Sequence, residues 1–346
     1  MPAENVTITK DIAATLSKFL EEGSFSRLAV VVDENTAAHC YPLIQDVLPA
    51  AHTVIEVKSG ELQKNLDTCS IIWNHLTEAH FDRKSLLINL GGGVIGDMGG
   101  FCAATYKRGM PFINLPTTLL AQVDASVGGK LGIDFQGFKN HIGLFQEPKQ
   151  VFIDPVFLQT LPERELRSGF AEVIKHALIA DAAYWNTLRS APFARQNWSA
   201  HIGHSVQVKS RVVDKDFLEG GLRKVLNFGH TIGHAVESYF LETDRPLLHG
   251  EAIAVGMIAE TFLSVRHTGL SPEEAEEIND FIIAVFGQPE IPTEAVEDIV
   301  QLTKQDKKND QQTIRCTLLE RIGLANYDVP ILEKDVQEAL TYYQGL

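Results

Sequence analysis

The sequence predicts an α/β protein with an N-terminal Rossmann-like, parallel-sheet domain and a mostly α-helical C-terminal domain. Apolar runs of strand length alternate with helical segments in the first half. A glycine triplet, Gly91–Gly93, follows one of these runs and precedes a helical segment. After Pro155 the pattern is helical almost throughout. Because 346 residues are many for one core, we expect two domains, residues 1–157 and 158–346.

Composition excludes several classes of function. The hydrophobic share of 45% and the charged share of 22% are those of an ordinary soluble globular protein. A formal net charge of −15 argues against binding to nucleic acid or to an anionic membrane. The N-terminal residues lack the pattern of a signal peptide, and no apolar run reaches the roughly 20 residues of a membrane span. The four cysteines are scattered, so we expect reduced thiols and a cytoplasmic location.

The first half should form the sheet. Each expected strand is a short run of apolar and β-branched residues, and no hairpin turn joins neighbouring runs, which favours parallel pairing. The expected strands are 28–32, 53–57, 86–90, 112–115 and 151–155, with connecting helices at 66–79 and 94–104.

The second half should be helical, with apolar residues at helical spacing. The expected helices are 163–180, 198–214, 231–241, 251–266, 272–286, 293–303 and 333–343, with one short strand at 313–318.

The glycine-rich turn after residues 86–90 predicts a phosphate site. Gly91, Gly93 and Gly96 fit the spacing G-x-G-x-x-G of dinucleotide-binding turns. Backbone N–H groups at the start of the following helix would face the phosphate. The acidic residue expected about 20 positions later is absent. Asp33, after an earlier strand, could accept a hydrogen bond from a ribose hydroxyl, but the residue alone favours a helix N-cap.

Residues 124–140 contain two glycine-flexed turns that carry Lys130 and Lys139. Such turns are typical of a loop that closes over an anion. We therefore expect a flexible anion-binding loop between the last two strands of the sheet.

The helical half contains a cluster of metal-ligand residue types. Glu172 and His176 are one helical turn apart, and so are His230 and His234, while His249 lies in a third cluster, residues 247–251. One carboxylate and two or more histidines, with one position left open, describe a catalytic Zn²⁺ site. The spacing does not decide which histidines are ligands.

Cations near this cluster predict an anionic ligand. Lys209 and Arg223 flank a glycine turn at 219–222, and a further basic stretch follows at 306–309. At a Debye length of about 8 Å, such local cations act despite the acidic net charge.

Long motifs make the sequence similar to a known family. They read GGGVIGD, LPTTLLAQVDASVGGK, FAEVIK, EGGLRKVLNFGHTIGH and LLHGEAIAVGM, in this order. Together they resemble 3-dehydroquinate synthase, a sugar-phosphate cyclase, over about residues 31–309. The resemblance implies an N-terminal NAD-binding α/β domain and a C-terminal helical domain. It also implies bound NAD, a divalent metal (Zn²⁺ or Co²⁺) and a homodimer. The substrate would be a small phosphorylated sugar acid.

The resemblance also implies roles for individual residues. Metal ligands would be Glu172, His230 and His249. Catalytic residues would be Glu219, His234 and Lys175. Substrate contacts would be Arg108, Asp124, Lys130, Asn140, Lys175, Lys209, Arg223, Asn227, His234 and Lys307. NAD contacts would be Asp33, Asn35, Glu61, Lys64, Gly92, Gly93, Val94, Asp97, Thr117, Thr118, Lys139, Phe157 and Thr160. His176 stands where the family is expected to have a small residue such as threonine.

The implied reaction converts 3-deoxy-D-arabino-heptulosonate 7-phosphate to 3-dehydroquinate and phosphate, a step of the shikimate pathway. NAD would oxidise the C5 alcohol and later return the hydride, so NAD is regenerated in each turnover. Two alternatives stay open at this point. One is a cyclase that makes a valiolone- or inosose-type ring, and the other is a metal-dependent polyol dehydrogenase with net redox chemistry.

Overall fold

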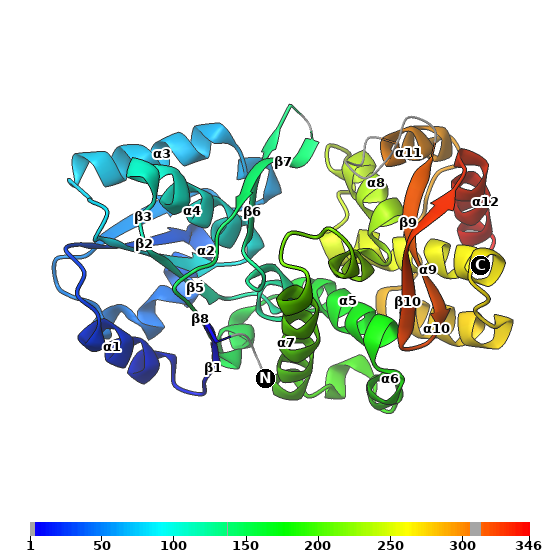
Figure 1. The fold of residues 1–346 in the computed structure, drawn as a ribbon, viewed down its shortest axis with the longest axis horizontal. Helices are drawn as coiled ribbons and strands as arrows, with labels where there is room; N and C mark the ends of the chain where they lie inside the picture. The colour runs from blue at the N-terminus through cyan, green and yellow to red at the C-terminus, as the bar shows by residue number, and fades with distance from the viewer. Residues whose placement is uncertain (1–3, 137, 305–312) are drawn as a thin grey trace. The chain divides into compact units, whose positions relative to one another are not determined.

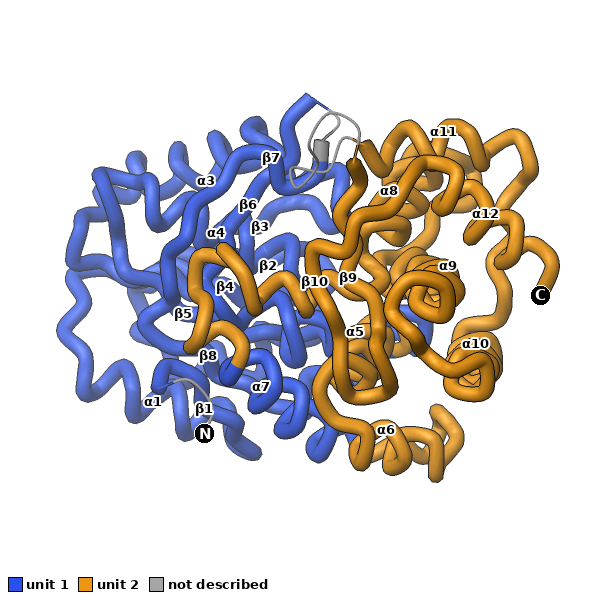
Figure 2. The backbone as a smooth tube through the Cα atoms, turned by 45° about the vertical axis from the view of Figure 1, so that its right-hand side comes forward, with its two compact units in different colours: residues 1–166, 198–211 blue, residues 167–197, 212–346 orange. Residues whose placement is uncertain are grey.

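The computed structural model of the protein describes residues 4–136, 138–304 and 313–346. It forms two compact units, shown in different colours in Figure 2. The first, here called the sheet unit, comprises Met1–Leu166 and Trp198–Arg211. The second, the helical unit, comprises Arg167–Asn197 and Val212–Leu346. The chain therefore passes between the units more than once, which the sequence did not predict. Independent domains bounded at residue 157 stay a prediction.

A six-stranded sheet forms the centre of the sheet unit (Figure 1). Its strand order is β1-β8-β5-β4-β2-β3, and every neighbouring pair is parallel. The predicted α/β class and the five predicted strands are confirmed. The sequence missed β1, which has only three residues. The strands are β1 (Val6–Ile8), β2 (Leu28–Asp33), β3 (Thr53–Val57), β4 (Leu86–Gly91), β5 (Phe112–Pro116) and β8 (Gln150–Ile153).

Helices cover both faces of this sheet because its strands alternate two sets of apolar side chains. In β2, Val30 belongs to a buried cluster with Leu16, whereas Val31 belongs to another with Ile72. The helices on the first side are α1 (Ile12–Glu22) and α2 (Glu34–His39), and those on the second are α3 (Leu66–Glu78) and α4 (Gly93–Thr105). Of these, the sequence predicted α3 and α4.

The strand order creates a switch point at β2. The chain runs from β2 to β3 on one side, then returns from β3 past β2 to β4 and continues to β5 on the other side, so the direction of winding reverses between β2 and β4. In open α/β sheets, ligands bind at the carboxyl ends of the strands at such a point. Asp33 ends β2 and Gly91 ends β4, so both predicted nucleotide segments lie at this edge.

The loop predicted at 124–140 forms regular structure in its second part, so the prediction of a loop is wrong there, while anion binding stays a prediction. After a π-helical turn (Ala121–Ala125), β6 (Lys130–Phe135) and β7 (Phe138–Phe145) pair as an antiparallel hairpin. Leu131 and Ile133 alternate along β6 and are buried in the core beside α4. The residue between them is Gly132, which is not polar, so the sequence shows no clear alternation of polar and apolar residues. The turn before β6 is present as predicted, with Gly128 and Gly129 at φ of +100° and +64°.

The helical unit confirms the predicted helices, with boundaries within two residues. The sequence missed α6 and β10, the partner of the predicted strand β9. The helices of the second half are α5 (Glu163–Ala180), α6 (Ala182–Arg189), α7 (Trp198–Lys215), α8 (His230–Phe240), α9 (His249–His267), α10 (Pro272–Phe286), α11 (Ala295–Thr303) and α12 (Glu333–Gln344). The strands are β9 (Ile314–Arg321) and β10 (Leu324–Ile331). Within the described ranges, none of these helices is long and apolar enough to cross a membrane.

Shorter helical turns connect these elements. They are the 3-10 turns Tyr41–Leu43, Gln45–Val47, Glu61–Gln63, Tyr106–Arg108, Pro155–Thr160, Phe193–Arg195 and Leu222–Asn227.

Helices α8 and α9 cross with their backbones in contact. A Cβ atom on Gly256 would lie 2.0 Å from the carbonyl oxygen of Gly229, and one on Gly233 would lie 3.0 Å from that of Ala252. Only glycine allows this approach, which sets the first turns of both helices beside each other. His230 and His249 begin these two helices.

We predict that Gly99→Ala destabilises the sheet unit. Asn89 donates its amide to Asn114 (2.9 Å) beneath α4, and both side chains are buried. A Cβ atom on Gly99 would lie 2.0 Å from Oδ1 of Asn89. Overpacking of this kind costs about 1–3 kcal/mol. The free energy of unfolding, measured in urea, should fall by that amount.

Gly96→Ala is the matched control, because nothing lies within 4 Å of its Cβ position in the same helix. Alanine is the better helix former, so this variant should keep or gain stability. Equal stability of the two variants would contradict the proposed clash.

Candidate active site

The predicted glycine turn is present at the carboxyl end of β4, and phosphate binding there stays a prediction. Strand β4 ends at Gly91 and α4 begins at Gly93, with Gly92 as the N-cap residue. Among the described residues no side chain caps this helix start, so its backbone N–H groups and the helix dipole suit an anion. A Cβ atom on Gly92 would lie 3.0 Å from the methyl group of Thr118. Thr117 donates its backbone N–H to Gly91 (3.0 Å), which fixes the two strand ends together.

A buried lysine joins residues that the resemblance assigns to NAD and to substrate. Lys64 contacts the carboxylate of Asp97 (2.6 Å) and the amide oxygen of Asn140 (2.7 Å), and is 5% exposed. Burial lowers the pKa of Lys64, but Asp97 and then Glu61 outweigh it and hold the pKa above its ordinary value. Lys64 is therefore charged. Lys139 pairs with Glu61 (3.3 Å) beside it.

The remaining residues assigned to NAD lie at the ends of other elements. Asp33 is the N-cap of α2 and accepts the backbone N–H groups of Asn35 (2.9 Å) and Thr36 (2.8 Å). The helix-cap interpretation of Asp33 is thus confirmed, and its contact with NAD stays a prediction. Val94 lies half-buried in the first turn of α4. In the turn Pro155–Thr160, Phe157 is buried whereas Thr160 is exposed.

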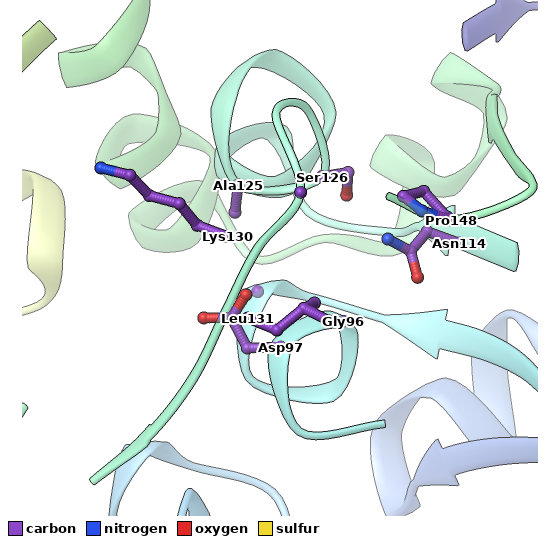
Figure 3. Close-up of a pocket in the computed structure, with 10 residues that line it drawn as sticks. Gly96, Asp97, Asn114, Ala125, Ser126, Lys130, Leu131 and Pro148 are labelled. Atoms are coloured by element: carbon purple, nitrogen blue, oxygen red, sulfur yellow. The ribbon is translucent and has the colours of Figure 1, made fainter. Parts of the chain in front are cut away.

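A pocket lies beside the start of α4 (Figure 3). Its lining includes Gly93, Gly96 and Asp97 from the helix side and Ser126 and Lys130 from the segment that leads into the hairpin. The glycine turn, a carboxylate and an exposed lysine therefore border one space within the sheet unit.

Helix α7 brings a further lysine to this unit. Lys209 contacts Asp124 twice, through the carboxylate (2.7 Å) and the backbone carbonyl (2.7 Å), and Lys209 is buried. These are two residues assigned to substrate, 85 positions apart in the chain. The contact holds the ammonium group of Lys209 in one place.

Arg108 is exposed and follows α4 in a tight turn. Its φ of +66° and that of Lys107, +49°, lie in the left-handed region that side chains with a Cβ seldom adopt. Lys107 donates to the carbonyl of Phe81 (2.6 Å), which supports the turn. Lys307, also assigned to substrate, lies outside the described residues.

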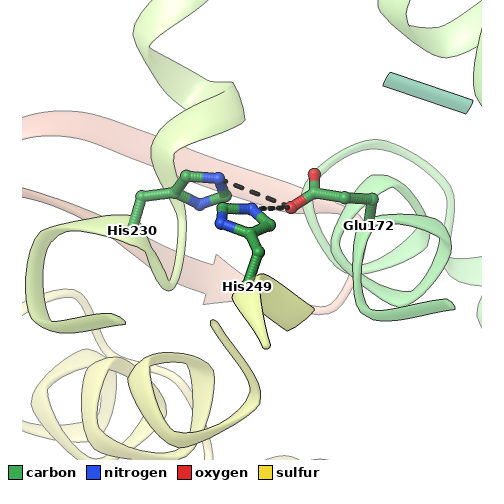
Figure 4. Close-up of side chains that lie close together, drawn as sticks. All are labelled: Glu172, His230 and His249. Atoms are coloured by element: carbon green, nitrogen blue, oxygen red, sulfur yellow. Dashed lines mark ion pairs between the residues drawn. The ribbon is translucent and has the colours of Figure 1, made fainter. Parts of the chain in front are cut away.

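In the helical unit, Glu172, His230 and His249 converge (Figure 4). Each histidine directs its Nε2 atom at the same carboxylate oxygen of Glu172, at 3.4 Å. The ligand atoms of all three residues lie within 4.8 Å of one another. Glu172 is fully buried on α5, and the two imidazoles come from the first residues of α8 and α9.

The far sides of the two imidazoles explain why their Nε2 atoms suit a cation. The Nδ1 atom of His230 lies 3.0 Å from the carbonyl oxygen of Phe228, and that of His249 lies 3.2 Å from Glu237. An oxygen acceptor at Nδ1 places the proton there and leaves a lone pair on Nε2. Two such lone pairs and a carboxylate directed at one point fit a divalent cation with three protein ligands.

Protonation competes with a cation at this point. Burial lowers the pKa of His249, but Glu237 and Glu172 outweigh it and raise the pKa to about 10. Burial, followed by the charge of Lys175, lowers the pKa of His230 well below its ordinary value. Before a metal binds, one proton on His249 can therefore balance the carboxylates, and metal binding would release it.

Three neighbours complete the cluster. The ring of His234 lies 5.0 Å from that of His230 and 5.9 Å from that of His249, between centroids. His234, Glu237 and His249 thus form a second, overlapping set of potential ligands within 4.8 Å. Lys175, buried on α5, contacts the other carboxylate oxygen of Glu172. His176 is also fully buried, one helical turn from Glu172.

The segment before α8 holds the other assigned residues of this unit. Asn227 donates its amide to the carboxylate of Glu219 (3.0 Å). Arg223 is 1% exposed, and its guanidinium group donates to the carbonyl of Phe217 (2.6 Å).

Sequence reasoning missed three carboxylates that support these residues. Glu237 lies on the α8 face of His230 and His234, and its spacing could have revealed it. Glu260, fully buried on α9, accepts the backbone N–H groups of Gly229 (2.6 Å) and Ile232 (3.0 Å) and so caps α8. A charged residue inside an apolar helix was its signal. Among the described residues, Asp216 accepts hydrogen bonds from backbone N–H groups, and no spacing pattern marks it.

The chain matches one family along most of its length. Residues 54–168 match the family described as 3-dehydroquinate synthase N-terminal, and residues 169–309 match 3-dehydroquinate synthase C-terminal. The 3-dehydroquinate synthase of Parabacteroides distasonis is 39% identical over 349 residues, covering 99% of this chain and 99% of the relative.

Solved structures of two cyclases share the fold. A 2-deoxy-scyllo-inosose synthase complexed with carbaglucose-6-phosphate, NAD⁺ and Co²⁺ gives a TM-score of 0.86 at 22% identity, covering 98% of this chain and 96% of that one. The 2-epi-5-epi-valiolone synthase of Streptomyces hygroscopicus, with NAD⁺ and Zn²⁺ bound, gives 0.85 at 24% identity, covering 100% and 98%. Such identities establish the architecture, whereas the matches at higher identity establish the family. On these grounds the chain belongs to the 3-dehydroquinate synthase family.

Proposed function

We propose that the protein converts 3-deoxy-D-arabino-heptulosonate 7-phosphate to 3-dehydroquinate and phosphate, as a lyase that uses NAD and a divalent metal. Membership of the 3-dehydroquinate synthase family supports the reaction. The observation that carries the proposal is the convergence of His230 and His249 on one buried oxygen of Glu172. That donor set is typical of a catalytic metal with an open position.

The cofactors follow from two groups of residues. Glu172, His230 and His249 would hold the metal, and the turn Gly92–Gly93 with its neighbours would hold NAD. Related folds with NAD⁺ and either Co²⁺ or Zn²⁺ bound support this assignment. When bound, the metal polarises a substrate oxygen as a Lewis acid, and NAD takes up and returns a hydride.

Fixed cations would bind the two anionic groups of the substrate. Lys209 is held on Asp124, Arg223 on the carbonyl of Phe217, and Lys175 on Glu172. Each of these cations is buried, so solvent screens its charge only weakly. Each side chain is also already held in place, so substrate binding does not have to order it. Lys130, Asn140 and Asn227 would add hydrogen bonds, as the resemblance implies.

His234 and Glu219 would move protons. His234 is half-buried beside both metal-ligand imidazoles, and the imidazole group suits proton transfer near neutral pH. Glu219 accepts a hydrogen bond from the amide of Asn227, which orients its carboxylate for the proposed proton transfer.

Three further assignments belong to the same proposal. Residues 1–157 would form the NAD-binding domain and residues 158–346 the metal- and substrate-binding domain. The protein would work as a cytoplasmic homodimer. Arg108, exposed on its own turn, would reach the substrate phosphate of the neighbouring subunit.

The reaction itself predicts redox balance. Since hydride is removed and returned within one cycle, the purified protein should release phosphate and form dehydroquinate from the heptulosonate phosphate with catalytic NAD. Absorbance at 340 nm should stay flat during turnover. Stoichiometric growth of NADH alongside product would instead favour a dehydrogenase. Turnover of a sugar phosphate without the carboxylate, but not of this substrate, would favour an inosose- or valiolone-type cyclase.

The ligand set predicts which variants lose the metal. Alanine at Glu172, His230 or His249 removes one of three ligands, so each variant should be nearly metal-free in elemental analysis after mild chelation and dialysis. His234→Ala should keep near-stoichiometric metal yet lose most of its turnover, by about 10²–10⁴-fold.

His234→Ala also tests the overlapping set of His234, Glu237 and His249. If that variant is metal-free while Glu172→Ala keeps a full complement, the overlapping set is the real one.

The shared-subunit role of Arg108 predicts complementation. Arg108→Ala and Lys175→Ala should each be inactive as separate homodimers. Mixed in equal amounts under conditions that exchange subunits, they should recover about a quarter of wild-type activity, since about half of the dimers become heterodimers and each heterodimer contains one site of two with both residues intact. Exchange is followed with two affinity tags. Demonstrated exchange without recovered activity would place Arg108 in its own subunit's site.

A further inference from the structure

The segment 216–227 of the helical unit concentrates three of the proposed site residues. Glu219, Arg223 and Asn227 lie within nine positions of one another, between the end of α7 and the start of α8. This segment contains one short 3-10 turn, Leu222–Asn227, and no regular hydrogen-bonded element before it. Something other than helix or sheet must therefore fix its shape.

The backbone at Glu219 is in an unfavourable conformation. Its φ of +60° lies in the left-handed region, which a side chain with a Cβ seldom adopts. Such a conformation persists only where the surroundings impose it, and it is common among residues that must present a side chain in one direction. The two residues that follow are Gly220 and Gly221.

Asp216 imposes this conformation through three backbone hydrogen bonds. Its Oδ1 atom accepts the N–H of Gly220 (2.9 Å), and its Oδ2 atom accepts those of Gly221 (2.7 Å) and Arg223 (2.9 Å). Both carboxylate oxygens are thus committed to one chain segment. The hydrogen bonds from Arg223 and Gly221 lower the pKa of Asp216, so the carboxylate stays ionised at neutral pH.

These bonds enclose Glu219 and anchor Arg223. The peptide after Glu219 is held by Oδ1, while the backbone of Arg223 is held by Oδ2. Two side-chain hydrogen bonds add to these: Arg223 donates to the carbonyl of Phe217, and Asn227 donates to the carboxylate of Glu219. Asp216 thus accepts three of the hydrogen bonds within this segment. Lys224 ties the segment to Asp328 and Thr317 outside it.

We propose that Asp216 is a positioning residue, which holds the Glu219 carboxylate and the Arg223 guanidinium in the geometry needed for proton transfer and anion binding. This inference rests on the proposed function of Glu219 and Arg223. Asp216 itself contacts no reacting group. It acts by removing backbone freedom before the substrate binds.

The test compares Asp216→Asn with a matched control. Asp181 caps α6 in the same unit through one backbone N–H, that of Tyr184 (3.0 Å), and is not part of the proposed site. Asp216→Asn replaces one acceptor oxygen by a donor and should lower kcat about 10- to 100-fold and raise KM. Asp181→Asn should leave both within about twofold, although its melting temperature also falls.

Two further measurements separate positioning from folding. Amide hydrogen exchange at Gly220, Gly221 and Arg223 should accelerate in Asp216→Asn while exchange in α8 and α9 does not. In a Glu219→Gln background, where the proposed proton-transfer group is already gone, Asp216→Asn should reduce kcat by less than threefold more, while the rise in KM that comes from Arg223 should persist.

The outcomes are distinct. Full turnover by Asp216→Asn overturns the inference, whether or not amide exchange rises. A full additional loss of kcat in the Glu219→Gln background also overturns it, because the two residues would then act independently. A wild-type protein that does not turn over the heptulosonate phosphate would contradict the proposed function. An active wild type with an equally active Asp216→Asn variant would contradict only the positioning role of Asp216.

Discussion

The buried carboxylate of Glu172 is the constraint on which the helical unit depends. A buried charge costs free energy unless other groups balance it. Here Lys175 contacts one carboxylate oxygen of Glu172, and the two imidazoles of His230 and His249 face the other. Delivering those imidazoles requires three helices to meet closely. A Cβ atom on Gly250 would lie 1.9 Å from the carbonyl oxygen of Ser168, so glycine is what lets the first turn of α9 lie against α5. Gly233 on α8 and Gly256 on α9 allow the same close approach between these two helices.

Much of the fold could be predicted because burial leaves a pattern in sequence. Strands such as β2 and β4 are continuous apolar runs, and the glycine turn after β4 is a local signal. The hairpin β6–β7 was missed because only two buried residues, Leu131 and Ile133, marked its alternation. Strand β1 is too short to show any pattern.

The candidate site was predictable as a set of residue types but not as a geometry. Helical spacing grouped Glu172 with His176 and His230 with His234, yet spacing along one helix cannot say which side chains of different helices meet. The family resemblance, not the spacing, selected His249. Glu260 and Asp216 escaped because their partners are backbone N–H groups, which every residue except proline provides. The ion pairs of the lysines could not be predicted for a similar reason. In an acidic chain many carboxylates are candidate partners, and the actual partner can be distant in sequence, as Asp97 is from Lys64.

The interleaving of the two units has a consequence for how this protein can evolve. The chain crosses from one unit to the other after Leu166, after Asn197 and after Arg211. A recombination event with a single breakpoint near residue 157 would therefore exchange the whole of α7, including the part that belongs to the sheet unit, together with the helical unit. The incoming helix would have to provide a lysine in register with the resident Asp124, or the ion pair at 2.7 Å would be lost. The two halves of the sequence therefore have to evolve together, because α7 follows the first half in space but lies in the second half of the chain. Functional chimaeras should need breakpoints on both sides of α7.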